Sequence, residues 1–537
     1  MNQAERLEIG YESEWIVAIG RTPNSAAKPG VNPWIIAVVV AMAAFMEVLD
    51  TSIANVALSH IVGSLGAGQS ESTWVLTTYL VANAIVIPIS GWLSSVLGRK
   101  LYFLICLALF TFSSFLCGIA PSLPLLLLFR VMQGAGGGGL QPVSQAMLAD
   151  TFEGPSFGMA FAVYGVAVVV APALGPAFGG WITDNFSWRW IFFINVPVGL
   201  LALILAERLT QDAPSLVEVT RRERSRGIRV DYMGFAFSAL AFGALQIVLD
   251  KGQEDDWFGS RFICVLAVMA TIGFVGLVVW EIMVVKEPIV DLPLMSNANL
   301  ATSMGLMFAV GFVLNATTVV IPQFAQQLMG YDATKAGLLL MPGGAVMVLL
   351  LPLAGKLVRQ VQPKYLLASG FLIIAGAFYY ASGFNVEVSF GNLATARFIQ
   401  CIGLPLCFVP MNTIAYSNLP PGKSNNASSL MNLMRNLGGS VGISVASTML
   451  DRRSQVHHAY LAGHVSHFYP PFVQHMAVTG GFTQTNILAF FNTVHAQALM
   501  LSYLDVFHLL LILCLSATGV VLLLRKVQGT IQPSMAH

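Results

Sequence analysis

The sequence predicts an all-α membrane protein with fourteen transmembrane spans, arranged as two related six-helix bundles plus two extra helices. Three observations support this prediction: the composition, the number of long apolar segments and an internal repeat. Of the 537 residues, 56% are hydrophobic and 10% are charged, whereas a soluble domain carries about 25% charged residues. The formal net charge of +1 argues against nucleic acid as a partner.

Fourteen segments are apolar over the roughly 20 residues that a membrane-spanning helix needs. They lie at about 34–59, 73–96, 101–119, 122–148, 158–183, 187–206, 231–249, 261–284, 301–324, 332–356, 365–384, 390–416, 427–450 and 500–525. We expect a cytoplasmic N-terminal arm (1–33), an N-terminal six-helix bundle (34–206), a cytoplasmic linker with two extra helices (207–300), a C-terminal six-helix bundle (301–525) containing a long periplasmic loop (451–497), and a cytoplasmic tail (526–537). The arm is polar and contains acidic residues, so it is not read as a cleavable signal peptide.

The internal repeat relates the two bundles. Residues 88–93 (PISGWL) resemble residues 352–357 (PLAGKL), 264 positions later, and residues 130–136 (RVMQGAG) resemble residues 397–403 (RFIQCIG), 267 positions later. Two similar offsets from independent motifs indicate that the second six spans repeat the first six. Parallel repeats around a site at the membrane midplane are typical of secondary transporters.

The basic residues predict how the spans are oriented, because cytoplasmic loops carry an excess of lysine and arginine. With the N-terminus inside, 18 of the 27 basic residues fall in cytoplasmic segments and 6 in external segments. Both chain termini are then cytoplasmic. Three arginines remain within spans: Arg130, Arg397 and Arg435.

Two carboxylates lie inside the first span, and one arginine lies inside the fourth. Glu47 and Asp50 are one helical turn apart, and Gln133 follows Arg130 by one turn. Asp50 and Arg130 both lie about 12–13 Å from the outer ends of their spans, at 1.5 Å per residue. Arginine stays charged in proteins, so we expect Arg130 to pair with one of these carboxylates. Ionisable residues at membrane depth are functional candidates by default.

This charged group has a functional and a structural interpretation. Burial and a nearby arginine shift the pKa of a carboxyl group in opposite directions, so a site that opens such a pair can load and release a proton. The alternative is a static ion pair that stabilises the bundle. We expect proton coupling at Asp50 and Arg130, with Glu47 as an auxiliary site.

The second bundle has no equivalent charge. Asn315-Ala-Thr is taken as the counterpart of Asp50-Thr-Ser, so Arg397, with Gln400 one turn away, has no carboxylate in its own half. We therefore expect a backbone or cross-domain partner for Arg397. Protonation chemistry is expected in the N-terminal half.

The loop after the second span contains Gly91, Gly98, Arg99 and Lys100. Glycines permit a tight turn between helices, and basic side chains can engage carboxylates or the carbonyl ends of helices. The functional interpretation is a latch that holds one conformation. The alternative is anchoring at the cytoplasmic surface.

The fifth span contains Gly175, Pro176 and Gly179. Gly175 and Gly179 form a small-xxx-small face that lets another helix approach closely, and a glycine–proline pair favours a kink. The residues alone do not separate this interpretation from ordinary tight packing.

The predicted external segment 451–497 is long, whereas the other external loops are short. It carries six histidines, but neither a cysteine nor a matching carboxylate cluster accompanies them as in a metal site. No metal and no cofactor are expected. The segment is either a solvated loop or a docking surface for a partner outside the membrane.

These motifs resemble those of the fourteen-helix drug:proton antiporters of the major facilitator superfamily, over about residues 34–525. The stretch 49–57 (LDTSIANVA) resembles the family's first-helix motif, 91–100 (GWLSSVLGRK) its second-to-third loop motif, 130–134 (RVMQG) its fourth-helix motif and 175–180 (GPAFGG) the fifth-helix motif associated with antiport. Residues 187–199 (SWRWIFFINVPVG) are similar to another characteristic stretch. Within the family the EmrB type is most similar.

The resemblance implies proton-driven export of diverse hydrophobic drugs across the bacterial inner membrane, together with a periplasmic adaptor and an outer-membrane channel. Two residues depart from the family pattern: Ser95 stands where the loop motif usually has an acid, and Glu47 where many relatives have an uncharged residue. We expect substrate-binding or conformational roles for the other motif residues: Gln133, Asn55, Gly91, Arg99, Lys100, Gly175, Pro176, Gly179, Arg397, Gln400 and Asn315.

The prediction is thus a proton-coupled antiporter for hydrophobic or amphipathic drugs, acting as the inner-membrane part of a tripartite pump. One alternative is a proton-coupled exporter of a single metabolite or siderophore-like compound. Another is a membrane sensor that transports nothing. No nucleophile–base set or metal site in the sequence indicates an enzyme.

Overall fold

The computed structural model describes residues 31–66, 68–152, 156–212, 217, 220–221, 231–285, 290–417, 419, 423–465, 470–479 and 481–522. The predicted N-terminal arm up to residue 30, most of the linker between 213 and 230, and the predicted tail lie outside these ranges. Within them, the regular elements are α-helices and short 3-10 turns.

The first half contains six long helices or helix pairs in chain order. They are α2 (Pro33–Leu65), α4 (Trp74–Leu97), α5 (Arg99–Ile119), α6 (Leu123–Thr151), α7 (Phe157–Asn185) and α9 (Asn195–Leu209), with the short helices α3 (Gln69–Ser72) and α8 (Trp190–Phe193) before α4 and α9. Two further helices follow, α11 (Tyr232–Lys251) and α12 (Arg261–Met283), with the 3-10 turns η2 (Trp257–Gly259) and η3 (Leu292–Ser296).

The second half repeats this order. It comprises α13 (Ala298–Gln327), α14 (Ala333–Leu338), α15 (Met341–Leu357), α16 (Pro363–Ala381), α17 (Phe390–Ala415), α18 (Ser424–Ala462), α19 (Pro470–Val478) and α20 (Gln484–Leu522). Each of the fourteen predicted spans coincides with one of these helices or helix pairs.

Twelve helices in the described ranges are long and apolar enough to cross a membrane. The other two predicted spans are α7, which is apolar over Phe157–Pro172, and α18. The polar character of α18 has a structural reason, since its residues Asn425, Ser428 and Asn432 are buried against the first half. Fourteen spans are therefore compatible with the structure.

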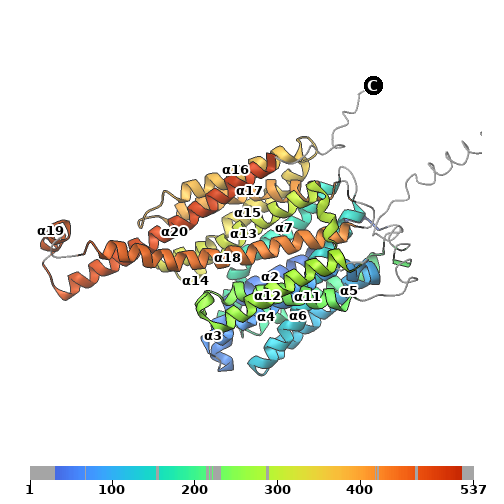
Figure 1. The fold of residues 1–537 in the computed structure, drawn as a ribbon, viewed down its shortest axis with the longest axis horizontal. Coiled ribbons are helices and arrows are strands. Elements are labelled where there is room, and N and C mark those ends of the chain that lie inside the picture. Colours follow the sequence, from blue (N-terminus) through green and yellow to red (C-terminus); the bar gives the residue numbers. More distant parts are fainter. Residues whose placement is uncertain are drawn as a thin grey trace, which may run out of the picture.

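The two halves meet mainly along two pairs of helices, α4 with α18 and α7 with α15, and α6 also contacts α18. Within the halves the packing is repeated, because α2 packs against α7 as α13 packs against α18. The extra pair α11 and α12 pack on each other, and α11 also contacts α4 and α18. The extra helices therefore border one seam between the halves, as Figure 1 shows.

α18 and α20 extend beyond the rest of the bundle as an arm, with α19 at its tip (Figure 1). Each of these helices is 39 residues long. The segment 451–497, predicted as a long loop, is therefore largely helical, since residues 451–462 continue α18 and residues 484–497 begin α20. Asp505 of α20 holds the arm together by pairing with Arg453 at 2.5 Å and His457 at 2.8 Å.

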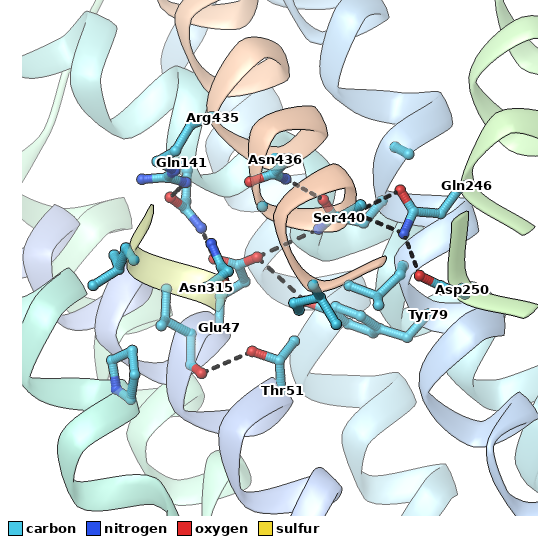
Figure 2. Close-up of a pocket in the computed structure, with 18 of the residues that line it drawn as sticks. Glu47, Thr51, Tyr79, Gln141, Gln246, Asp250, Asn315, Arg435, Asn436 and Ser440 are labelled. Atoms are coloured by element: carbon cyan, nitrogen blue, oxygen red, sulfur yellow. Dashed lines mark hydrogen bonds between the residues drawn. The ribbon is translucent and has the colours of Figure 1, made fainter. Parts of the chain in front are cut away.

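A cavity of about 180 Å³ lies at the seam between the halves. Its walls come from α2, α4, α6 and α7 of the first half, α11 of the extra pair, and α13 and α18 of the second half (Figure 2). The cavity is lined by both polar and apolar side chains, which makes it the candidate place for a ligand.

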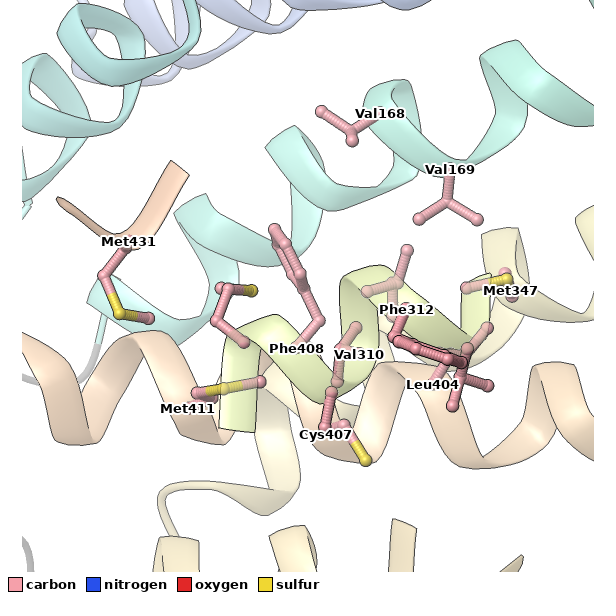
Figure 3. Packing of buried hydrophobic residues seen from close by; sticks show 14 of the residues in the cluster. Val168, Val169, Val310, Phe312, Met347, Leu404, Cys407, Phe408, Met411 and Met431 are labelled. Atoms are coloured by element: carbon pink, nitrogen blue, oxygen red, sulfur yellow. The ribbon is translucent and has the colours of Figure 1, made fainter. Parts of the chain in front are cut away.

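One apolar core runs through both halves. Figure 3 shows Val168 and Val169 of α7 directed toward side chains of the second half, among them Phe408 of α17. A glycine permits this approach, because a Cβ atom on Gly165 would lie 3.1 Å from both Leu351 and Phe408. The cavity lies between this contact, where Val168 of α7 also lines it, and the helices α11 and α18.

Candidate functional site

Asp50 of α2 and Arg130 of α6 form a buried ion pair. Arg130 Nη1 lies 2.6 Å from Asp50 Oδ2, and the two side chains are 0% and 1% exposed. The structure thus selects Asp50, and not Glu47, as the carboxylate that faces Arg130. The matching depths of the two residues in their spans were the signal that predicted this contact.

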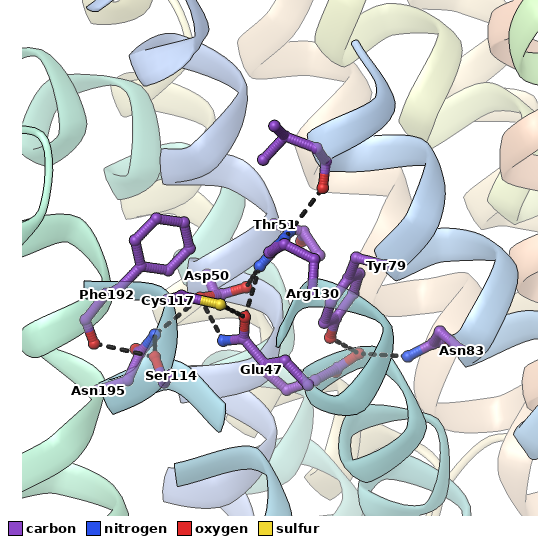
Figure 4. Close-up of polar contacts among 12 residues, drawn as sticks. Glu47, Asp50, Thr51, Tyr79, Asn83, Ser114, Cys117, Arg130, Phe192 and Asn195 are labelled. Carbon is purple, nitrogen blue, oxygen red and sulfur yellow. Dashed lines mark hydrogen bonds and ion pairs between the residues drawn. The ribbon is translucent and has the colours of Figure 1, made fainter. Parts of the chain in front are cut away.

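Neutral amides complete the surroundings of Asp50 (Figure 4). Gln133 and Asn195 each donate to Asp50 Oδ1 at 2.8 Å. Arg130 donates in addition to Gln133 Oε1 at 2.8 Å and to the backbone oxygen of Val75 at 3.0 Å. Such bonds are needed because burying two charges costs more than their attraction returns unless the remaining polar atoms are satisfied.

Asn195 is a site residue that the sequence analysis did not select. It begins α9, where the short helix α8 ends, and it also donates to Ser114 Oγ at 3.1 Å. Ser114 in turn donates to the backbone oxygen of Phe192 at 2.9 Å. The signal was available, since Asn195 lies in the characteristic stretch 187–199.

Glu47 belongs to a second network. Its Oε1 accepts from Tyr79 at 3.4 Å and from Asn83 at 3.3 Å, and its Oε2 accepts from Gln141. Gln141 Oε1 accepts from Arg435 of α18 in the other half. Glu47 is therefore connected across the seam through one amide, a link that no sequence pattern indicated.

Tyr79 lies between the two networks. Its hydroxyl donates to Glu47, and its ring lies 4.4 Å from the guanidinium carbon of Arg130. This is a cation–π contact, which stabilises a desolvated arginine. A change in the charge on either carboxylate therefore reaches the other through Tyr79.

The second half contains a close copy of the ion-pair site, built without a carboxylate. Arg397 Nη1 donates to Thr317 Oγ1 at 2.8 Å and to Gln400 Oε1 at 2.9 Å, and Gln400 donates to Thr317 at 3.0 Å. Thr317 follows Asp50 by 267 positions, the same offset as Arg397 from Arg130. The prediction of a backbone or cross-domain partner for Arg397 is therefore wrong, because the Thr317 hydroxyl in the same half accepts its hydrogen bond.

Asn315 is not the counterpart of Asp50, as the sequence analysis took it to be. It lies two residues before Thr317, donates to the backbone oxygen of Gly311 at 3.0 Å and lines the cavity at the seam. Asn55, one of the predicted substrate or conformational residues, is exposed on α2 and apart from both polar networks.

Gly91 and the basic pair Arg99 and Lys100 were predicted in a loop, but Gly91 lies within α4, the basic pair begins α5, and only Gly98 separates the two helices. Gly91 lies in the seam between the halves. A Cβ on Gly91 would lie 3.0 Å from the Asn426 side-chain oxygen and 3.3 Å from Ser429 Oγ. Asn425 donates to the backbone oxygens of Ser90 and Gly91 at 3.0 and 3.1 Å. Gly355, its repeat partner, meets the backbone of Gly158 and Met159, so both copies of the motif let the halves approach at one end of the bundle.

The basic residues of this motif fasten the same end. Arg99 forms a buried ion pair with Asp150 at the end of α6 and donates to the backbone oxygen of Ala146 at 2.9 Å. Lys100 donates through Nζ to the backbone oxygen of Glu207 at 2.9 Å. Ser95 bonds within its own helix, to the Trp92 oxygen at 2.8 Å.

The fifth-span motif brings α7 close to α2. A Cβ on Gly175 would collide with Ser52, and one on Gly179 would lie 3.2 Å from Ile53. Pro176 lies within the continuous helix α7, and its side chain is outside the described residues. α7 therefore packs directly behind the span that carries Glu47 and Asp50.

The part of the chain that the structure describes contains no candidate metal site, because no group of three or more His, Cys, Asp or Glu residues is placed to hold an ion. The side chains of His467 and His475, two of the six histidines of segment 451–497, lie outside that part.

Two repeated helical halves around a central cavity define a membrane transporter of the secondary type. The sequence pattern of the Major Facilitator Superfamily matches residues 40–443, so the chain belongs to that superfamily. It is 40% identical over 437 residues to the multidrug export protein EmrB of Haemophilus influenzae, covering 80% of this chain and 83% of that protein.

Two further comparisons agree. The chain is 39% identical over 431 residues to the fatty acid resistance protein FarB of Neisseria gonorrhoeae, covering 79% of this chain and 82% of that protein. The solved structure of the proton:xylose symporter XylE superposes with a TM-score of 0.57 at 15% identity, covering 88% of this chain and 94% of that one. This last likeness concerns the fold.

Proposed function

We propose that this protein is a proton-coupled antiporter that exports hydrophobic and amphipathic drugs across the bacterial inner membrane. The single observation that supports proton coupling most directly is the buried pair of Asp50 and Arg130 at 2.6 Å. The names of the similar proteins EmrB and FarB support export of drug-like, amphipathic compounds.

Protonation of Asp50 would cancel its attraction for Arg130. Arg130 has other acceptors in place, Gln133 and the Val75 oxygen, so its charge stays solvated by protein when the pair opens. The weakened contact between α2 and α6 would change the packing of the first half. Because Glu47 of α2 is linked through Gln141 to Arg435 of the second half, the halves would then change their relative tilt. Inward movement of one proton gains about 2.3 kcal/mol per 100 mV of membrane potential, which sustains roughly a 50-fold substrate gradient per charge.

The positions of the contacts between the halves indicate which conformation of the transport cycle the structure represents. Asn425, Gly91, Gly158 and Gly355 all bring the halves together at the end that carries Arg99 and Lys100. The excess of basic residues predicts that this end is cytoplasmic. The conformation proposed is therefore closed to the cytoplasm, with both chain termini on that side.

A tripartite assembly is supported by the arm of α18, α19 and α20. It projects beyond the bundle (Figure 1) and exposes large apolar side chains, among them Val456, Tyr460, Phe482 and Phe491. We propose that this arm is the contact surface for a periplasmic adaptor, which connects the transporter to an outer-membrane channel.

The test is efflux from proteoliposomes under an imposed pH gradient, with wild type and Asp50→Asn compared. The amide keeps the shape and cannot carry the proton, so drug efflux should fall to the level of empty vesicles while the protein still inserts. Asp255→Asn, an exposed carboxylate outside both networks, is the matched control. Undiminished efflux by Asp50→Asn would refute proton coupling at this residue.

A broad substrate range separates this proposal from the alternative of a single metabolite. Growth of a drug-sensitive host that expresses the protein should improve in the presence of several chemically unrelated drugs. Protection against one compound alone would favour the metabolite exporter instead.

A further inference from the structure

The extra helix α11 contributes a carboxylate to the cavity at the seam. Asp250 and Gln246, one turn apart on α11, line the cavity together with Glu47 of α2 and Arg435 of α18 (Figure 2). The predicted span ended at residue 249, so sequence reasoning placed Asp250 outside the membrane and gave it no role.

Gln246 fixes the position of Asp250. Gln246 is 3% exposed, and its Nε2 donates to Asp250 Oδ1 at 3.0 Å and to Ser440 Oγ at 2.9 Å. Ser440 donates back to Gln246 Oε1 at 3.1 Å. The carboxylate of the extra helix is therefore held at the wall that α18 forms.

The second oxygen of Asp250 has no hydrogen-bond partner in the described part of the chain, although it is buried. The Thr77 hydroxyl is placed to donate to the carboxyl group of Asp250 and also to the backbone oxygen of Thr73 at 3.2 Å, so two acceptors compete for its single proton. A buried carboxylate oxygen without a partner is costly. Its retention at a cavity wall therefore points to a ligand that supplies the missing donor.

The neighbouring cations are already engaged. Lys251, next in sequence, contacts Glu254 at 2.6 Å and also bonds Thr73. Arg435 donates to Gln141, which donates to Glu47, so its formal charge is opposed by that carboxylate. Among the described charged residues of the cavity wall, Asp250 is in no ion-pair contact, and the neighbouring Lys251, whose charge acts on it, is bound to Glu254.

We propose that Asp250 recognises the cationic group of a positively charged amphipathic ligand, and that the extra helices thereby take part in substrate selection. The ligand's ammonium or iminium group would form a charge-assisted hydrogen bond or ion pair with Asp250, and its apolar part would contact Val48, Leu80 and Ile443 on the same wall. This inference rests on the proposed export function.

The experiment measures dye binding to the purified full-length protein in lipid nanodiscs by fluorescence, with ethidium as the cation and Nile red as the neutral probe. Asp250→Asn should raise the Kd for ethidium by roughly tenfold or more, because removing one partner of a buried charge pair is costly. Its Nile red Kd should stay within about twofold of wild type, since no charge pair is lost with a neutral dye.

Two matched variants complete the test. Asp250→Glu keeps the charge and should retain ethidium binding within about threefold, whereas a merely structural Asp250 would tolerate neither change. Asp255→Asn, five residues further along and exposed, should bind both dyes as wild type does. Unchanged ethidium binding by Asp250→Asn, or an equal loss for both dyes, would overturn the inference.

The outcome is separable from that of the proposed function. Proteoliposomes that pump no drug, while ethidium binding still depends on Asp250, would refute the antiporter and leave the cation site standing. Vesicles that pump drugs in exchange for protons, with an Asp250→Asn variant of unchanged ethidium affinity, would do the reverse.

Discussion

The two halves of this protein build the same polar site from different chemistry. In the first half Arg130 and Gln133 surround a carboxylate, Asp50, and in the second half Arg397 and Gln400 surround a hydroxyl, Thr317. The distances are nearly the same, with the arginine 2.6 Å from its acceptor in one half and 2.8 Å in the other.

This difference distinguishes the residues that support helix packing in both halves from the residue that can exchange a proton. An arginine and a glutamine that bind a small acceptor on the neighbouring helix are common to both halves, so they serve helix packing in each. A threonine hydroxyl keeps its proton at physiological pH, whereas a carboxyl group can exchange one. Proton exchange is therefore expected in the first half. The charge of the corresponding site in the second half stays the same throughout the cycle.

The largest effect is expected from making the first half a copy of the second. Asp50→Thr should reduce proton-driven drug efflux by about 100-fold or more, because the exchangeable group is lost while Arg130 keeps an acceptor. Efflux from proteoliposomes under a pH gradient measures this. Thr317→Ser, which keeps its hydroxyl, should transport normally. Coupled efflux by Asp50→Thr would mean that the proton is carried elsewhere.

A smaller effect is expected from removing the acceptor of the second half. Thr317→Val leaves the buried Arg397 Nη1 with one acceptor fewer and Gln400 Nε2 without its bond to Thr317. Stability should fall by about 1–3 kcal/mol, seen as a lower unfolding temperature in detergent. Efflux per folded molecule should persist. Complete loss of coupling in folded Thr317→Val would show that the second half takes part in the chemistry.

An intermediate perturbation of the first half tests the role of its additional donor. Asn195→Ala removes one of the two amides on Asp50 Oδ1, so the charged form of Asp50 loses about 0.5–1.5 kcal/mol of hydrogen bonding. Proton-driven drug efflux should fall by roughly twofold to tenfold, because Asp50 and Arg130 are then held less firmly in place. Efflux from proteoliposomes under a pH gradient measures this. Efflux equal to that of wild type would contradict the assigned donor role.

The smallest effect is expected at the link between the two networks. Tyr79→Phe removes the long 3.4 Å bond to Glu47 and keeps the ring beside Arg130. Efflux should change by less than about fivefold, since a hydrogen bond this long contributes about 1 kcal/mol at most. Tyr79→Val, which removes the ring as well as the hydroxyl, should cost more, because the cation–π contact with Arg130 is then lost. Equal losses in both variants would assign the role to the hydroxyl.

Much of the fold could be predicted because span length and apolarity are local properties of the chain. The pairing of Asp50 with Arg130 was also predictable, since two isolated charges at equal depth leave few other partners. The repeat was recognised, but its two offsets of 264 and 267 positions do not define a single counterpart for Asp50, and Asn315 was taken in place of Thr317.

What sequence reasoning missed has a common physical cause. Gln141 and Asn195 are neutral amides in apolar helices, and they become site residues through contacts 94 and 145 positions away in the chain. Asp250 lies at the end of its span, where hydropathy alone marks it as external. The segment after residue 450 is polar, so it read as a loop, although Asp505 pairs with Arg453 and His457 across the two helices of the arm.

The two 39-residue helices of the arm are each about 58 Å long at 1.5 Å per residue, nearly twice the roughly 30 Å hydrocarbon thickness of a bilayer. Both belong to the second half, and the proposed cycle changes the tilt of the two halves relative to each other. Because the arm is long, a small rotation of the second half within the membrane displaces the tip of the arm by a larger distance. A partner bound at the tip would therefore be moved in each transport cycle.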